Sequence, residues 1–216
     1  MKFTDGYWQM RAGLTAHFPE QVYEVDVEPD GLTVYAPTRR LTHRGDTLNA
    51  PMVSVRVSSP MHNVGRIEIQ HHKGRRRSKP TFELEPLTAP AITIDDDAQA
   101  ATLASGDLTV RVEKVGDWRV DFTAGGRLLT TSGRHGVGLI DTEQGPYIHE
   151  QLALGVGECV YGLGERFTPF VKNGQVVDLW NEGGGTSSEP AYKNVPVLCH
   201  QPRLRRVRQP PGARLI

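Results

Sequence analysis

Residues 21–35 read QVYEVDVEPDGLTVY, and this stretch decides the fold class. Apolar side chains alternate with polar ones on both sides of the Pro-Asp-Gly break at 29–31. Period-2 alternation places one face of a strand in a core and the other in water. Pro, Asp and Gly favour a tight turn. The stretch therefore predicts two antiparallel strands, at 22–27 and 32–35, joined by that turn.

The same alternation recurs along residues 20–160. Further runs lie at 52–57, 67–69, 92–94 and 108–112, with the turn-forming triplets Ser-Gly-Asp at 105–107 and Ala-Gly-Gly at 124–126. No segment carries an apolar helical stripe over three turns. With 23 Gly and 15 Pro in the chain, the pattern predicts an all-β protein, an antiparallel β-sandwich or barrel. Its length of 216 residues favours one large domain over two small ones.

Charge and composition exclude several classes of function. Lys+Arg and Asp+Glu each total 25, so no global charge draws the chain to nucleic acid or to an acidic membrane. The basic run at 71–79 lacks interleaved aromatics and is interpreted as a solvated loop rather than a phosphate or nucleic-acid patch. The acidic run at 95–97 lacks the glycine and glutamate of a calcium loop and predicts a turn. We expect no metal and no cofactor.

The cysteine and hydropathy patterns bear on the cellular compartment. Cys159 and Cys199 have no neighbouring Cys or His at zinc spacing, which fits reduced thiols, although a disulfide stays open. No apolar run reaches signal-peptide length near the N-terminus, and none approaches the roughly 18 residues of a membrane span. We therefore expect a soluble, cytoplasmic protein.

Two motifs stand out after residue 154. Residues 155–167 read GVGECVYGLGERF, and residues 180–196 read WNEGGGTSSEPAYKNVP. The first predicts a structural corner, because glycines let the backbone pass close to a neighbour and a Glu-Arg pair can fix a buried turn. Its candidate residues are Tyr161, Gly162, Gly164, Glu165 and Arg166.

The second motif combines an aromatic, an amide, a carboxylate and three glycines, a set able to lay polar groups against sugar hydroxyls. Its candidate substrate-binding residues are Trp180, Asn181, Glu182, Gly183, Gly184 and Thr186. A substrate-facing role and a purely structural one both stay open from the residues alone.

Together with residues 1–8, 21–39 and 58–74, these motifs resemble glycoside hydrolase family 31, in its bacterial α-xylosidase branch. The resemblance covers about residues 1–197. It implies a galactose-mutarotase-like N-terminal β-sandwich that, in the complete retaining enzyme, supports the barrel while α-linked xylose or glucose is removed from oligosaccharides. It also implies that the 180–186 loop reaches the substrate. The family often has an aspartate just before the double glycine, where this chain has Gly183 with Glu182 alongside.

No catalytic residue is expected in this chain. Retaining glycosidases need two carboxyl groups about 5 Å apart, and in this family both are aspartates on a (β/α)8 barrel of roughly 250 residues. That barrel is expected to be absent here. Pairs such as Asp107 with Asp117, or Glu83 with Glu85, lie in turns or on solvated strand faces. We expect the chain to be inactive alone.

The tail, residues 198–216, has a composition unlike the rest. It contains five arginines and three prolines without periodicity. It can be encoded by codons that, read one base later, give a Gly-Tyr-Gly turn and an alternating Val-Phe-Val strand similar to the family. We therefore expect a frameshift near Val197, an accidental and disordered tail, and a sandwich that lacks one paired strand. A basic nucleic-acid arm is the rival interpretation.

Two other functions stay open. A stand-alone carbohydrate-binding module would need several exposed aromatics, whereas Trp8 and Trp118 fall in or beside strand patterns that suggest a core. An interaction protein built on the basic tail would bind nucleic acid in a salt-dependent way. The resemblance favours the hydrolase, with oligosaccharide as the partner of the complete enzyme, and relatives suggest a homo-oligomer.

Overall fold

The computed structural model describes residues 3–4, 9–70, 88–179 and 193–201. Within these residues the chain forms fourteen strands and a single helix, the 3-10 helix η1 at Arg44–Thr47. Two compact units are present, divided between Ala153 and Leu154. We call the described residues up to Ala153 the sandwich unit and those from Leu154 the C-terminal unit. The predicted domain of residues 1–197 spans both.

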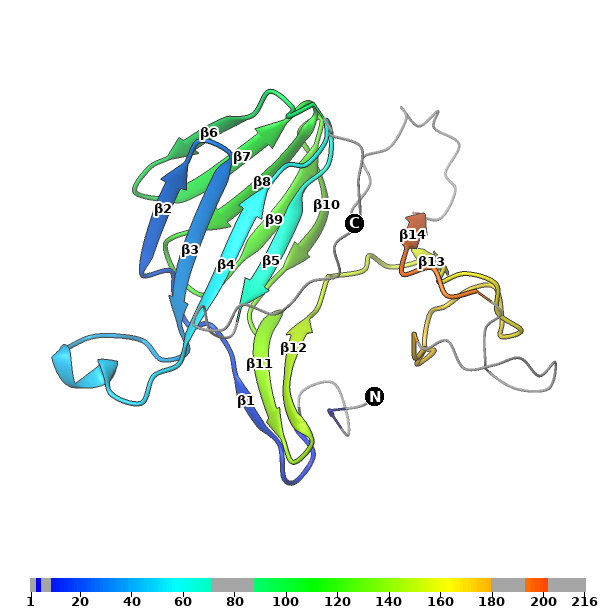
Figure 1. Ribbon diagram of the computed structural model, residues 1–216, viewed down its shortest axis with the longest axis horizontal. Coiled ribbons are helices and arrows are strands. Elements are labelled where there is room, and N and C mark those ends of the chain that lie inside the picture. The colour runs from blue at the N-terminus through cyan, green and yellow to red at the C-terminus, as the bar shows by residue number, and fades with distance from the viewer. Residues whose placement is uncertain (1–2, 5–8, 71–87, 180–192, 202–216) are drawn as a thin grey trace. The chain divides into compact units, whose positions relative to one another are not determined.

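Two antiparallel sheets form most of the sandwich unit (Figure 1). The first has the order β2-β3-β4-β5, with bounds Glu24–Glu28, Gly31–Pro37, Met52–Ser58 and Arg66–Gln70. The second has the order β10-β9-β8-β7-β6, with bounds Arg127–Ser132, Val120–Ala124, Leu108–Glu113, Ala100–Ser105 and Thr93–Asp96. The predicted all-β, antiparallel sandwich is confirmed, and each of the six quoted alternating runs overlaps a strand.

Smaller sheets complete the strands. In the sandwich unit, β1, β11 and β12 pair in the order β1-β11-β12, with bounds Thr15–His17, Val137–Thr142 and Gly145–Glu150. In the C-terminal unit, β13 pairs with β14, with bounds Cys159–Gly162 and Leu198–Gln201. Within the part of the chain that the structure describes, no helix has the length and apolar character needed to cross a membrane.

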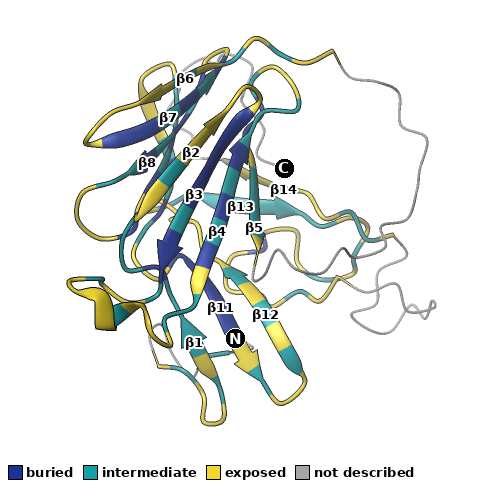
Figure 2. Ribbon diagram, turned by 60° about the vertical axis from the view of Figure 1, so that its left-hand side comes forward, coloured by how far each residue is buried: buried dark blue, intermediate teal, exposed yellow. Residues whose placement is uncertain are grey.

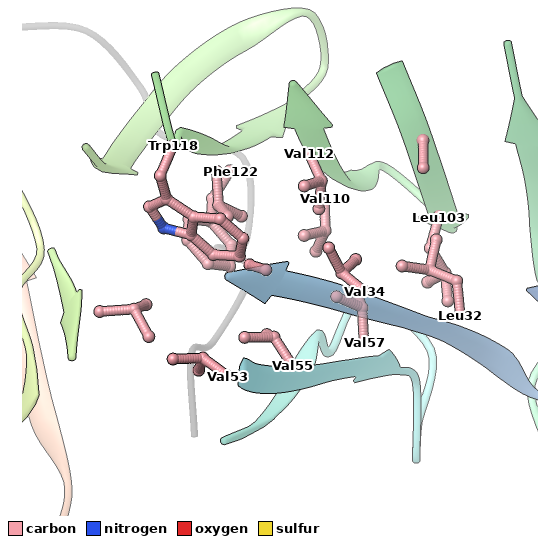
Figure 3. Close-up of a cluster of buried hydrophobic side chains, with 14 of the residues drawn as sticks. Leu32, Val34, Val53, Val55, Val57, Leu103, Val110, Val112, Trp118 and Phe122 are labelled. Carbon is pink, nitrogen blue, oxygen red and sulfur yellow. The ribbon is translucent and has the colours of Figure 1, made fainter. Parts of the chain in front are cut away.

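Strand alternation produces the core. Along β4, Val53, Val55 and Val57 are fully buried while the residues between them are half-buried. Figure 2 shows β3 buried along most of its length, as expected for a strand inside its sheet. Side chains of the two sheets meet in one apolar cluster (Figure 3), which includes Leu32, Val34, Leu103, Val110, Val112, Trp118 and Phe122. The predicted core position of Trp118 is confirmed at 1% exposure.

The turns follow the sequence signals. Between β9 and β10 the two-residue loop is Gly125-Gly126, with φ of 55° and 76°. Positive φ at both positions is the requirement of a type I′ hairpin, which glycine meets without strain. The turn predicted at the acidic run begins only at its last residue. Asp95 and Asp96 belong to β6, whereas Asp97 Oδ1 accepts the Gln99 and Ala100 amides at 2.6 and 2.8 Å.

Strand pairing continues past the predicted boundary at residue 197. Strand β14 begins at Leu198, and each β13 residue has a partner in it, from Cys159↔Gln201 to Gly162↔Leu198. The expected unpaired strand is therefore not found at β13. The expectation of a disordered tail over residues 198–216 is wrong for residues 198–201, which form β14. Residues 202–216 lie outside the described residues, as do the basic run at 71–79 and Trp8.

Candidate functional site

The first motif lies in the C-terminal unit, where a turn follows β13. The Leu163 and Glu165 amides donate to the Val197 and Lys193 carbonyls at 2.9 and 3.0 Å. The returning backbone of residues 193–197 is thereby held directly against the turn.

Glycine is required at two positions of this turn. A Cβ atom on Gly162 would overlap the Val197 carbonyl oxygen, and one on Gly164 would overlap the Lys193 carbonyl oxygen. Both glycines also have positive φ, 109° and 87°, a region that disfavours other residues. The Gly-Leu-Gly spacing of the motif thus reflects a close approach of two backbone segments. Beside the turn, the Tyr161 ring packs against Phe170 with centroids 5.1 Å apart.

Arg166 binds three separate segments of the C-terminal unit. Its Nε donates to the Leu163 carbonyl at 3.1 Å and its Nη2 to the Asp178 carbonyl at 2.8 Å. Nη2 also donates to the side-chain oxygen of Asn194. The Glu165 side chain is exposed. The side chain that fixes the corner is therefore that of Arg166, whereas Glu165 contributes its backbone amide.

Two further polar residues build the unit, and the sequence reasoning missed them. Lys172 is only 8% exposed, and its ammonium donates to the Thr168 hydroxyl and the Pro169 carbonyl at 3.0 and 2.7 Å. The side chain of the next residue, Asn173, binds the backbone at the start of β13. Its amide nitrogen donates to the Glu158 carbonyl, and its oxygen accepts the Val160 amide. The Asn-Gly pair at 173–174 could have pointed to Asn173, since this pair marks a turn in the sequence.

The second motif falls outside the described residues. The chain leaves the described region after Leu179 and returns at Lys193, so the structure places none of the predicted substrate-binding residues: Trp180, Asn181, Glu182, Gly183, Gly184 and Thr186. Two of the three Arg166 partners, Asp178 and Asn194, lie within two residues of those points.

The other carboxylates and thiols considered from the sequence form no catalytic or metal-binding group in the described regions. Asp117 is exposed and pairs with Arg40 at 3.1 Å, and Asp107 lies in the exposed β7–β8 turn. Both cysteines are free thiols. Across residues 3–4, 9–70, 88–179 and 193–201, no three His, Cys, Asp or Glu side chains form a group that could hold a metal ion.

Comparison with known families explains this combination of a sandwich with a glycine-rich corner. The model of the glycosyl hydrolase 31 N-terminal galactose mutarotase-like domain matches residues 54–202. This chain belongs to the glycosyl hydrolase 31 family. The match to its N-terminal domain runs past residue 197 to include β14, in agreement with the strand pairing.

Two curated relatives resemble this family 31 chain along most of its length. An α-xylosidase of Lactiplantibacillus pentosus, XylQ, is 42% identical over 199 residues, which are 91% of this chain and 26% of the relative. An α-xylosidase of Emericella nidulans is 34% identical over 217 aligned positions, covering 91% of this chain and 28% of the relative. The chain thus spans about a quarter of the length of these relatives.

Solved structures share the fold. A cycloalternan-forming enzyme from Listeria monocytogenes, in complex with a pentasaccharide substrate, matches 87% of this chain and 17% of its own, with a TM-score of 0.65 and 18% identity. A family 31 dextranase of Flavobacterium johnsoniae matches 85% of this chain and 21% of its own, with a TM-score of 0.62 and 16% identity. At these identities the likeness supports the fold alone.

Proposed function

We propose that this chain is the N-terminal, non-catalytic part of an α-xylosidase-like glycoside hydrolase. In the complete enzyme it supports the catalytic barrel, while α-linked xylose or glucose is removed from an oligosaccharide. The observation that carries the proposal is the 42% identity to an α-xylosidase across 91% of this chain. We also propose a cytoplasmic protein that assembles as a homo-oligomer.

The proposed direct contribution to the substrate is the loop that contains Trp180, Asn181, Glu182, Gly183, Gly184 and Thr186. An indole ring offers a face on which a sugar can stack, and the amide and carboxylate offer hydrogen bonds to hydroxyls. Support comes from the corner that precedes this loop: residues 162–166 and 193–197 are bonded to each other on either side of it.

We further propose that residues 202–216 are read out of frame. The family match and the β14 pairing both extend past Val197, so we move the proposed change of frame to a point after Gln201. The arginine-rich composition of residues 203–214 supports this proposal.

Sequencing the coding DNA from the Tyr192 codon onward, with translation in three frames, tests both proposals. We expect one frame to continue into alternating strands and helices with two aspartates at strand ends. If no frame beyond this point encodes a barrel, the hydrolase proposal fails, and a stand-alone carbohydrate-binding sandwich becomes the better account. That alternative predicts that the 216-residue chain binds oligosaccharides by itself.

A further inference from the structure

We infer that Arg166 is a positioning residue that joins the two described parts of the chain on either side of residues 180–192. One nitrogen, Nη2, contacts the Asp178 carbonyl at 2.8 Å on the entering side and the Asn194 side chain on the returning side. The guanidinium therefore sets the distance between Asp178 and Asn194. The functional consequence for sugar binding rests on the proposed function.

The arrangement suits arginine in particular. A guanidinium carries five N–H donors in a rigid plane, whereas an ammonium is a compact point charge with three. Here the planar group reaches acceptors from three segments, on Leu163, Asp178 and Asn194. These are two carbonyls and a side-chain amide, so the contacts depend on the direction of the donors more than on their charge.

The base beneath Arg166 is held independently of it. The Leu163 and Glu165 amides bond the returning backbone, and Lys172 fixes the segment after the turn through Thr168 and Pro169. Arg166 thus has a fixed support from which to hold Asp178 and Asn194. Its removal should release those two residues while the rest of the C-terminal unit stays folded.

The experiment uses the full 216-residue chain labelled with 5-fluorotryptophan. Fluorine NMR reports on Trp180, which is two residues from Asp178, and Trp180→Phe assigns its signal. The signal of Trp118 in the core of the sandwich unit is the internal control. Amide exchange at Val160 and Lys172, which are hydrogen-bonded to Asn173 and Val160, reports whether the C-terminal unit remains folded.

We expect Arg166→Ala to move the Trp180 signal at least halfway toward its position in urea-unfolded chain, with Trp118 unchanged. Arg166→Lys and Asn194→Ala should move it in the same direction by less. Exchange of the Glu165, Val160 and Lys172 amides should change less than about twofold in Arg166→Ala, because their hydrogen bonds do not involve Arg166.

Two results would overturn the inference. One is a Trp180 signal that stays at its wild-type position in both Arg166 variants. The other is loss of Val160 and Lys172 protection in Arg166→Lys and Asn194→Ala, which would make Arg166 a general fold stabiliser. Calorimetric titration with an α-xylosyl oligosaccharide separates the two proposals: if the wild-type chain binds no sugar, sugar contact by the isolated chain fails, but the positioning role is still judged by the fluorine signal.

Discussion

At the scale of single residues, the glycines of the corner show how sequence encodes close backbone contact. Gly162 and Gly164 combine positive φ with a neighbouring carbonyl that leaves no room for a Cβ atom. Gly174 has positive φ as well, 74°, but nothing lies near its missing Cβ. The three positions therefore separate the cost of backbone strain from the cost of steric overlap.

We predict that Gly164→Ala destabilises the C-terminal unit by about 3 kcal/mol or more, because strain and overlap add. The matched control Gly174→Ala should cost about 1 kcal/mol, from strain alone. Urea unfolding followed by amide exchange in β13 measures both. Equal costs at the two positions would contradict the close approach at Gly164.

We also predict a lowered pKa for Asp46, which lies in the loop between β3 and β4. Its carboxylate accepts the Thr42 hydroxyl and the Thr42 and His43 amides at 2.7, 2.8 and 3.0 Å. These bonds, the Thr42 hydroxyl first, lower the pKa of Asp46 to about 2. A depressed folded-state pKa means that its stabilising effect is present above the ordinary value near 3.8 and is lost as pH falls toward 2.

NMR titration of the Asp46 carboxyl carbon should therefore give a midpoint near 2 in the wild-type chain. Thr42→Val removes the hydroxyl donor but keeps the amide, so the pKa should rise toward its ordinary value without reaching it. An unchanged midpoint in Thr42→Val would show that the hydroxyl does not contribute.

At the scale of elements, strand alternation made the sandwich predictable, and weak alternation hid several strands. Each alternating run overlaps a strand, and the run at 52–57 forms β4 with three fully buried Val positions. Strand β12 was not singled out, because its sequence, GPYIHE, has two adjacent apolar residues and no period-2 alternation. Strand β14 was assigned to the tail, because its four residues, LCHQ, carry no clear pattern. Its pairing depends on β13, a partner nearly forty residues away, and not on local preference.

Truncation tests the β13–β14 pair. A chain that stops after Val197 should lose protection of the β13 amides against hydrogen exchange, because their partners are removed. A chain that stops after Gln201 keeps β14 and should match the full chain. If both truncations protect β13 equally, β14 does not stabilise it.

Buried and exposed leucines of the sandwich unit should respond differently to replacement by alanine. Leu103 on β7 is 1% exposed within the apolar cluster, so Leu103→Ala should lower the free energy of unfolding by about 2–5 kcal/mol. Leu128 on β10 is 51% exposed, and Leu128→Ala should cost about 0.5 kcal/mol or less. Chemical denaturation followed by tryptophan fluorescence measures both, and similar losses would contradict the packing of the two sheets.

At the scale of the whole molecule, the fold was more predictable than the site. The sandwich follows from a repeated local pattern, which a single sequence carries in full. The corner depends on contacts between distant segments, such as Arg166 with Asn194, and spacing alone does not reveal these. The candidate sugar-binding residues were selected from their chemistry and the family resemblance, and their roles stay predictions.

We propose that this chain completes an α-xylosidase without being one itself. The most direct measurement is the rate of p-nitrophenyl α-D-xyloside hydrolysis by residues 1–201 fused to the remaining three quarters of the Lactiplantibacillus pentosus α-xylosidase. We predict that the 216-residue chain alone is inactive, that the fusion is active, and that Trp180→Ala in the fusion raises KM. Hydrolysis by the chain alone, or a folded fusion with no activity, would contradict this account.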